Sequence, residues 1–254
     1  MDLPLPDGDV VAGVERLGAK LADLRATVGR VIFGQAEVVD QSLVSLLAGG
    51  HVLLIGVPGL AKTRLVETLG AVFGLDHGRI QCTPDLMPSD ILGSEVLEEQ
   101  ANGRRAFRFI EGPVFCQLLM ADEINRASPR TQSALLQAMQ EHRISIAGAN
   151  RPLPAPFHVL ATQNPLEQEG TYPLPEAQLD RFLMQVDVTY PDAAAERTML
   201  LATTGVEVAE ATAVMTPGDL QTAQALVRRL PVGESVIDGI LKLVRSARPE
   251  QDAP

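Results

Sequence analysis

The sequence predicts an α/β domain followed by a small helical domain. Short apolar runs alternate with helical patterns up to about Tyr190, which is typical of a parallel sheet with helices on its faces. From Pro191 onward the strand signals stop, and capped helical segments follow. A glycine-rich loop lies between the first apolar run and the next helix, where a strand-to-helix connection of an α/β fold belongs.

Two helices are predicted before the first strand. Between Asp9 and Val31, apolar residues recur at alternating steps of three and four, which makes one helical stripe. Because this run is short, the stripe favours packing on the domain over a coiled-coil seam. Ile32-Phe33-Gly34-Gln35 interrupts the pattern, and Ala36 to Ala48 forms the second helix. The residues of the stripe are Val14, Leu17, Leu21, Leu24 and Val28.

Five short apolar runs are predicted to be strands of one parallel sheet. Four of them are mostly apolar, Arg79–Cys82 is more polar, and each ends at a glycine or at polar residues, as buried strands do. The runs are His51–Ile55, Arg79–Cys82, Gln117–Ala121, His158–Thr162 and Phe182–Val188.

Two hairpins and two helices are predicted between these strands. Asn102-Gly103 is a strong two-residue turn signal inside Glu95–Phe109, and Arg143–Asn150 alternates before a turn that contains glycine. A short helix is expected after Pro88. A longer one opens at Ser128, which is a preferred N-cap residue and precedes a proline.

Three helices are predicted after the sheet. They cover Asp192–Thr203, a segment that opens at Thr216-Pro217-Gly218-Asp219, and Gly233–Ala247. The chain therefore divides into an N-terminal helix at residues 1–31, the α/β domain at 32–190 and the helical domain at 191–254.

The glycine-rich loop is predicted to bind the phosphates of ATP or ADP. A strand, a loop and a helix N-terminus direct backbone N–H groups and positive potential at one centre. Lys62 would reach the β- and γ-phosphates, and the Thr63 hydroxyl would ligate Mg²⁺. An ordinary strand-to-helix turn is the alternative. The predicted nucleotide-binding residues are Gly56, Val57, Pro58, Gly59, Leu60, Ala61, Lys62, Thr63 and Arg64, with Ala61 where a glycine is usual.

Asp122 and Glu123 follow the third apolar run and are predicted to serve the metal ion and the attacking water. Carboxyl ends of parallel strands form the site in α/β folds, so both side chains would lie near the loop. Asp122 would hold Mg²⁺ directly or through water, and Glu123 would accept a proton from the water or orient it. A solvent-facing acidic pair is the alternative.

Asn164 and Arg181 are the other two predicted catalytic residues, with Glu123 and Lys62. Asn164 ends the fourth strand, so its amide would point between Lys62 and Glu123 if that strand lies between the first and third. An Asx-turn before Pro165 would look the same in sequence. Arg181 is expected at the entry of the fifth strand, where it suits a neighbouring subunit's γ-phosphate. A salt bridge to Asp180 or Glu176 explains its position equally well.

Composition excludes several other classes of protein. The formal net charge is −11, and the 254 residues include no Trp and two Tyr, so both a basic field and stacking aromatics are missing for nucleic-acid binding. The most apolar window is interrupted by glycines, a histidine and a proline, which argues against a membrane span. The N-terminus has no signal-peptide pattern, and we expect a cytoplasmic protein whose two cysteines are buried thiols. The four histidines lack metal-ligand spacing.

Four motifs in this order resemble the MoxR branch of the AAA+ ATPases. They are Gly56 to Thr63, Ala121-Asp122-Glu123-Ile124-Asn125-Arg126, Ala161-Thr162-Gln163-Asn164-Pro165 and Pro175 to Phe182. The resemblance runs from about Ile32 to the end, and alanine before the lysine is usual in that branch. It implies a P-loop three-layer sandwich with a five-stranded parallel sheet and a small all-α lid. It also implies a Walker A loop, a Walker B pair, sensor 1 at Asn164 and an arginine finger at Arg181.

The resemblance implies further features of the chain. The two hairpins look like the helix-2 insert and the pre-sensor-1 insert, and Ile32, Phe33 and Gly34 match the segment that packs near adenine. Family members continue past Arg248 into a lid helix with a sensor-2 arginine. This chain stops at Pro254, so we expect an incomplete lid and assign no sensor-2 residue.

The resemblance also implies a function. It suggests an Mg²⁺-dependent ATPase that forms a homo-oligomeric ring, a hexamer in the family's manner, and remodels or matures a client protein with a von Willebrand A domain partner. Two alternatives stay open: an ATP-dependent assembly module with little turnover, and a chelatase-type motor subunit. The net charge argues against a nucleic-acid motor.

Overall fold

The computed structural model describes residues 10–99, 105–167, 170–204 and 210–248. It contains one parallel sheet of five strands in the order β2-β5-β8-β1-β9, so the fourth predicted strand does lie between the first and the third. Every pairing in this sheet is parallel, as the sequence predicts. The strands are β1 (Val52–Ile55), β2 (His77–Gln81), β5 (Leu118–Asp122), β8 (His158–Gln163) and β9 (Met184–Asp187).

The helices begin and end close to the predicted positions. Ser128 caps α5 by accepting a hydrogen bond from the Thr131 amide, and Asp192 caps α7 in the same way. Thr216 and Asp219 form a capping box at the start of α8. The helices are α1 (Val10–Gly29), α2 (Ala36–Leu47), α3 (Lys62–Val72), α4 (Pro88–Leu92), α5 (Pro129–Glu141), α6 (Glu176–Leu179), α7 (Ala193–Thr203), α8 (Pro217–Val227) and α9 (Glu234–Ser246).

The sheet separates two apolar cores, which makes three layers. Successive residues of a strand face opposite layers, so Val52 and Leu54 of β1 join one core while Leu53 joins the other. The first core contains residues of α1, α2, α3 and α8, and the second contains residues of α4 and α5. Leu24 and Val28 of the predicted helical stripe are fully buried in the first core.

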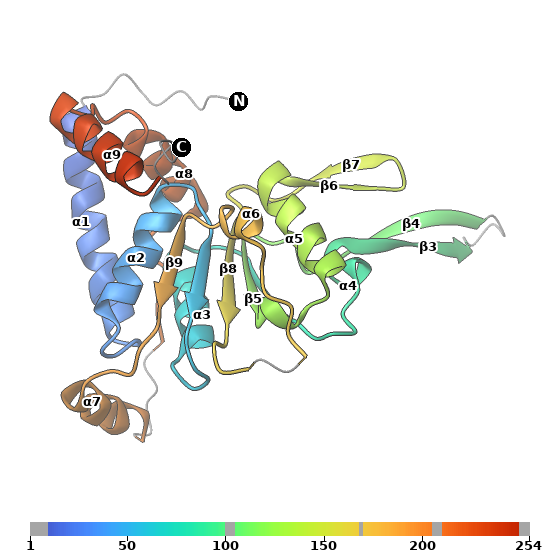
Figure 1. The fold of residues 1–254 in the computed structure, drawn as a ribbon, viewed down its shortest axis with the longest axis horizontal. Helices are drawn as coiled ribbons and strands as arrows, with labels where there is room; N and C mark the ends of the chain where they lie inside the picture. Colours follow the sequence, from blue (N-terminus) through green and yellow to red (C-terminus); the bar gives the residue numbers. More distant parts are fainter. Residues whose placement is uncertain (1–9, 100–104, 168–169, 205–209, 249–254) are drawn as a thin grey trace, which may run out of the picture.

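Two hairpins extend side by side from one flank of the sheet, away from α1 and α9 (Figure 1). They are β3–β4 (Gly93–Glu99 and Arg105–Glu111) and β6–β7 (Arg143–Ile146 and Ala149–Pro152). The second hairpin turns through Ala147 and Gly148, which both have positive φ as its two-residue loop requires. The predicted turn at Asn102-Gly103 lies outside the described residues.

Within the described ranges, no helix combines the length and the apolar character that crossing a membrane requires. Cys82 and Cys116 are buried free thiols, and burial raises the pKa of Cys82 to about 12 and that of Cys116 to about 11. These two thiols are therefore unreactive parts of the second core.

His51 ties the start of β1 to two neighbouring elements. Its Nδ1 atom accepts a hydrogen bond of 2.9 Å from the Val159 amide, and Nε2 lies 3.3 Å from the Met139 carbonyl oxygen. The ring is therefore held in its neutral form. Burial lowers its pKa from 6.5 to about 4, and the adjacent His158 lowers it as well.

We expect His51 to make the protein less stable in mild acid. Between pH 6.5 and about 4 the unfolded chain carries a proton on this residue that the folded chain does not, so stability falls as the pH falls. From pH 7.5 to pH 5 the free energy of unfolding should drop by about 2 kcal/mol through this group. Urea unfolding at the two pH values measures the difference.

The matched variants are His51→Asn and His77→Asn. Asparagine at position 51 can still accept from the Val159 amide but does not titrate, so the loss between the two pH values should shrink. His77 is exposed, and His77→Asn should keep the parent's pH dependence. An unchanged pH dependence in His51→Asn would show that other groups cause it.

Candidate functional site

The predicted site residues meet at the carboxyl edge of the sheet. The ends of β5, β8 and β1 are adjacent there, because these strands are neighbours in the sheet. A cavity of about 400 Å³ lies at this edge and contains the loop after β1 and the polar residues after β5 and β8. Its lining consists of Pro58, Gly59, Leu60, Ala61, Lys62, Thr63, Arg64, Asp122, Glu123, Thr162 and Asn164.

The loop reaches the cavity through two left-handed residues. Gly59 has φ +87°, a conformation that glycine adopts without steric cost. Ala61 has φ +56° and is the last residue before α3. Because an L-residue in this region is strained by about 1–2 kcal/mol, Ala61 stores conformational energy next to Lys62. Gly56 has a different role: a Cβ there would lie 2.6 Å from the Val188 carbonyl oxygen.

Lys62 places a positive charge inside the loop. Its Nζ atom donates hydrogen bonds of 2.5 Å to the Gly56 carbonyl and 2.9 Å to the Val57 carbonyl. Burial lowers the pKa of Lys62 below its ordinary value, while the nearby Asp122 and Glu123 carboxylates act in the opposite direction. The ammonium group is therefore part of the same charged cavity as the two acidic residues.

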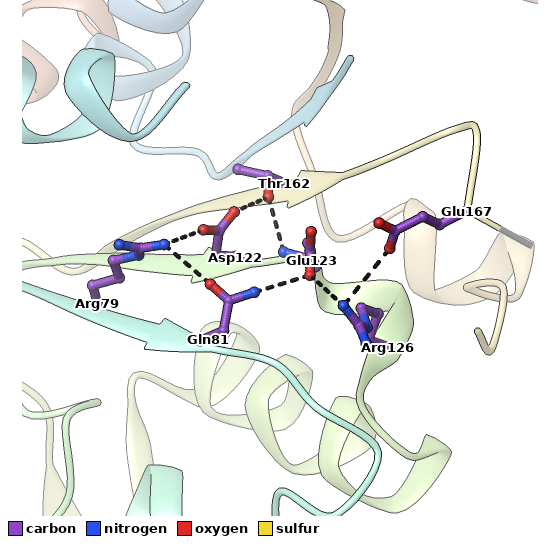
Figure 2. A network of polar contacts seen from close by, with 7 residues as sticks. All are labelled: Arg79, Gln81, Asp122, Glu123, Arg126, Thr162 and Glu167. Carbon is purple, nitrogen blue, oxygen red and sulfur yellow. Dashed lines mark hydrogen bonds and ion pairs between the residues drawn. The ribbon is translucent and has the colours of Figure 1, made fainter. Parts of the chain in front are cut away.

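Asp122 is held on both carboxylate oxygens (Figure 2). Oδ1 accepts a hydrogen bond of 2.6 Å from the Thr162 hydroxyl, and Oδ2 forms an ion pair of 2.6 Å with Arg79. The Asp122 side chain is 14% exposed, whereas that of Arg79 is 51% exposed. The sequence analysis identified Asp122 but neither of its partners.

Glu123 has a strained backbone and a restrained side chain. Its φ of +54° is unusual for glutamate, and its amide donates a hydrogen bond of 2.9 Å to the Thr162 hydroxyl. Such conformations cost about 1–3 kcal/mol and concentrate at functional sites. The Oε2 atom accepts from Gln81 at 3.0 Å and from Arg126 at 3.1 Å. Arg126 ends the short 3₁₀ helix Ile124–Arg126 and lies 3.8 Å from Glu167 (Figure 2).

Asn164 lies in the cavity lining and also forms the Asx-turn that the sequence offered as an alternative. It lines the cavity and is 5% exposed, and its Oδ1 atom also accepts a hydrogen bond of 3.1 Å from the Leu166 amide, which is the Asx-turn. Because the turn uses the oxygen, the side-chain NH₂ group is the donor that remains for a ligand in the cavity.

Arg181 does not line the cavity, and two expectations about its surroundings are wrong. It lies in the turn between α6 and β9 instead of at the strand entry, because the strand begins at Met184. Its Nη1 atom donates a hydrogen bond to Gln140 on α5, where the sequence suggested Asp180 or Glu176 as the partner. The Nε atom is buried without a hydrogen-bond partner.

Ile32, Phe33 and Gly34 line a second hollow. They line a separate hollow of about 400 Å³ together with Ala195 and Thr198 of α7, and the lining of that hollow includes none of the residues Gly56 to Thr63. Gly34 has φ +68°, and a Cβ there would lie 2.6 Å from the Cβ atoms of Pro191 and Ala195. The predicted adenine segment therefore meets the helical region at this hollow.

The residues of the cavity fit a magnesium–nucleotide complex. Thr63 and Asp122 offer oxygen ligands, which Mg²⁺ prefers, and Lys62 offers a cation for phosphate. Among the described residues there is no group of three or more His, Cys, Asp or Glu side chains that could hold a metal ion. A site with so few protein ligands suits Mg²⁺, which takes its remaining ligands from water and from phosphate.

Comparison with known proteins gives consistent matches. The family model described as "ATPase family associated with various cellular activities (AAA)" matches residues 51–184. The chain is 46% identical to Chaperone MoxR1 of Mycobacterium tuberculosis over 243 residues, which cover 94% of this chain and 63% of that protein. It is 36% identical to Protein MoxR of Paracoccus denitrificans over 187 residues, covering 72% and 54%.

Two further matches cover more of the other chain. Uncharacterized protein YeaC of Bacillus subtilis is 41% identical over 222 residues, which cover 87% of this chain and 68% of that protein. The crystal structure of a candidate ATPase from Cytophaga hutchinsonii has a TM-score of 0.82 and 41% identity, covering 91% of this chain and 69% of that one. The chain spans less than two thirds of the length of the mycobacterial relative.

The left-handed loop residues generate a stability prediction. Ala61→Gly should raise the free energy of unfolding by up to about 1 kcal/mol, because it removes the strain at φ +56° and this gain exceeds the entropy cost of glycine. Gly59→Ala should lower it by about 1 kcal/mol, because it introduces the same strain at φ +87°. Chemical denaturation of the three proteins measures both changes. Destabilisation by Ala61→Gly would contradict the assigned loop conformation.

Proposed function

Because the chain belongs to the MoxR family of AAA+ ATPases, we propose that it binds ATP with Mg²⁺ and hydrolyses it as part of a ring that works on a client protein. One observation carries the proposal: a single cavity contains Lys62, Thr63, Asp122 and Glu123. These are a phosphate-binding cation, two oxygen ligands for a metal, and a carboxylate that can take a proton.

Lys62, Thr63 and Asp122 bind the substrate in this proposal. The Lys62 ammonium exchanges its loop carbonyls for phosphate oxygens, which carry more negative charge. Thr63 and Asp122 would hold Mg²⁺, which would supply positive charge to neutralise the charge that develops on the phosphates. The Thr162 hydroxyl keeps Asp122 oriented toward the cavity. Backbone N–H groups of the loop and the α3 N-terminus add positive potential.

Glu123 is the proposed general base, and Asn164 assists it. The Glu123 carboxylate accepts a proton from the attacking water, which increases the nucleophilicity of its oxygen. Asn164 contributes its NH₂ group, which can donate to the water or to a phosphate oxygen. Gln81 and Arg126 hold Glu123 through Oε2, so its second oxygen, Oε1, remains for the water.

The hydrogen bonds on Glu123 also favour the second candidate function. Gln81 and Arg126 both donate to Oε2 of Glu123, so these two donors compete with a water molecule for the carboxylate. An assembly module that binds ATP but turns it over slowly would have this arrangement. The rate of hydrolysis distinguishes the two functions.

We assign Arg181 to the nucleotide of a neighbouring subunit. Its absence from the lining of its own cavity supports action in trans. A head-to-tail contact of this kind closes into a ring, which the family resemblance suggests is a hexamer. Arg181 would then stabilise charge on the transferring phosphoryl group.

The client and the cellular setting rest on family resemblance. The name of the mycobacterial relative supports a chaperone-like role, and a von Willebrand A domain protein is the partner that the resemblance suggests. A net charge of −11 disfavours nucleic acid as the client, and we place the activity in the cytoplasm. The Ile32–Gly34 segment as an adenine contact and the division at residues 32 and 191 remain predictions.

Replacing the proposed base tests the hydrolysis reaction. Glu123→Gln should bind a fluorescent ATP analogue like the parent but hydrolyse ATP about 10²–10⁴-fold more slowly, because the amide cannot take the proton. Glu141→Gln is the matched control, since Glu141 forms an exposed ion pair with Arg143 outside the cavity. Equal turnover in Glu123→Gln and the parent would move the base elsewhere, and negligible turnover in the parent would favour the assembly module.

Mixing two inactive variants tests the role of Arg181. Arg181→Ala alone should lose about 10³–10⁵-fold in rate, and mixing it with Lys62→Ala should restore part of the activity. In a mixed ring some interfaces pair an intact Lys62 with a neighbour's intact Arg181. The specific activity of the parent should also rise with protein concentration as rings form.

The structural alternative makes a different prediction. If Arg181 serves only to anchor α6 on α5, Gln140→Ala should have the same effect as Arg181→Ala, because both remove the hydrogen bond between the two side chains. Both variants would then be less stable, and mixing with Lys62→Ala would restore nothing. That result would assign Arg181 to the structure of one subunit.

A further inference from the structure

Arg79 is a second cation at the proposed metal carboxylate. It lies on the edge strand β2, whose residues His77 to Gln81 pair with β5 so that Gln81 is the register partner of Asp122. The Arg79 Nη2 atom is 2.6 Å from Asp122 Oδ2 and 3.0 Å from Gln81 Oε1 (Figure 2). This pair involves the oxygen of Asp122 that Thr162 does not use.

Arg79 and Thr63, one of the two proposed metal ligands, line a common hollow. Thr63 and Arg79 both line a small hollow of about 160 Å³ beside the main cavity, and Thr63 lines the main cavity as well. Arg79 therefore pairs with the Asp122 carboxylate and lines the same hollow as Thr63. A divalent cation held by the oxygens of Asp122 and Thr63 would meet the positive charge of Arg79 at short range.

We propose that Arg79 is an internal counter-cation of Asp122 that competes with Mg²⁺ and so sets the Mg²⁺ concentration at which nucleotide binds. This inference rests on the proposed function of the cavity. Two cations cannot both approach Asp122 Oδ2 closely without strong repulsion, so binding of the ion requires the guanidinium to move away.

The two partners differ in their freedom to move. Asp122 is largely buried and fixed by Thr162, whereas the Arg79 side chain is half exposed on an edge strand. The guanidinium can exchange the carboxylate for water at small cost, because ion pairs with an exposed partner are weak. Arg79 is thus the group that leaves, and Asp122 stays in position.

Without Mg²⁺, Arg79 has the opposite effect on nucleotide binding. It neutralises Asp122, which would otherwise repel the phosphates of a metal-free nucleotide in the same cavity. Removing the positive charge should therefore weaken binding of metal-free ADP and, at the same time, lower the Mg²⁺ concentration needed for tight binding. These opposite effects are specific to a counter-cation.

The test measures binding of the fluorescent analogue MANT-ADP to the full chain, first in EDTA and then as MgCl₂ is added at constant ionic strength. Arg79→Met removes the charge and keeps most of the apolar stem, and Arg79→Lys retains a cation. Arg143→Met is the matched control. Arg143 lies on the second hairpin, is 54% exposed and forms an ion pair with Glu141 at the end of α5. Thermal unfolding checks that each variant is folded.

We expect the half-saturating Mg²⁺ concentration of Arg79→Met to fall about threefold to tenfold, as suits a partly exposed ion pair. Metal-free MANT-ADP should bind it more weakly, and binding at saturating Mg²⁺ should match the parent. Arg79→Lys and Arg143→Met should remain close to the parent. If Arg79→Met does not fold, Arg79→Gln, which also removes the charge, replaces it, and the same two shifts are expected.

Three other outcomes would overturn the inference. Equal Mg²⁺ dependence in all variants would reduce Arg79 to a structural partner of Asp122 while leaving the proposed function intact. Weaker binding of Arg79→Met both in EDTA and at saturating Mg²⁺ would indicate direct contact with phosphate. Failure of the parent itself to bind MANT-ADP would overturn the proposed function together with this inference.

Discussion

A single hydroxyl group fixes both acidic residues of the candidate site. The Oγ1 atom of Thr162 donates to Asp122 Oδ1 and accepts from the Glu123 amide, so it connects the end of β8 to the end of β5 at two points. Thr162 is 1% exposed, and this burial excludes water from both hydrogen bonds. The hydrogen bond from the Glu123 amide to Thr162 helps to hold the strained backbone of Glu123, because glutamate has no intrinsic preference for a positive φ. The orientations of the proposed metal carboxylate and of the proposed base therefore share one support.

This support exists only because of the order of the strands. β8 lies between β5 and β1, so residues at its carboxyl end are adjacent to the phosphate loop on one side and to the acidic pair on the other. The two apolar cores on either side of the sheet stabilise this order, since successive strand residues alternate between them. A one-residue shift of β8 would reverse which of its side chains face each core and would move Thr162 away from Asp122. Burial of apolar residues in the two cores thus places the Thr162 hydroxyl where it bonds both Asp122 and Glu123.

The amino-acid sequence predicted the parts of the site that depend on short segments. Lys62 and Thr63 follow from one loop, and Asp122 with Glu123 follows from one apolar run and the residues after it. The partners of these residues come from other strands: Arg79 and Gln81 from β2, and Thr162 from β8. Their roles depend on which strands are neighbours, and a single sequence does not contain that information. A polar residue that ends the apolar run His158–Thr162 is the one signal that pointed to Thr162.

The same limit explains why the partner of the Arg181 side chain was not predicted. Its neighbours in the sequence, Asp180 and Glu176, suggested a local ion pair, but the turn after α6 directs the side chain to Gln140 on α5. Helical packing between α5 and α6 decides this contact, and Gln140 is 41 residues away in the chain. Sequence spacing identifies short-range partners well and long-range partners poorly.

The charges around the cavity give a physical reason for a catalytic group from outside the subunit. Among the described residues, Asp122 already has Arg79 as its ion-pair partner and Glu123 has Arg126, while Lys62 donates to carbonyls of the loop. A magnesium–ATP complex brings roughly two further negative charges, and more negative charge collects on the transferring phosphoryl group. Lys62 and the α3 N-terminus can compensate for part of it. Arg126 can contribute only by abandoning the partly buried Glu123 carboxylate, and Arg79 moves away when Mg²⁺ takes its place at Asp122. A cation supplied by a neighbouring subunit avoids this cost and adds positive charge only where subunits are in contact.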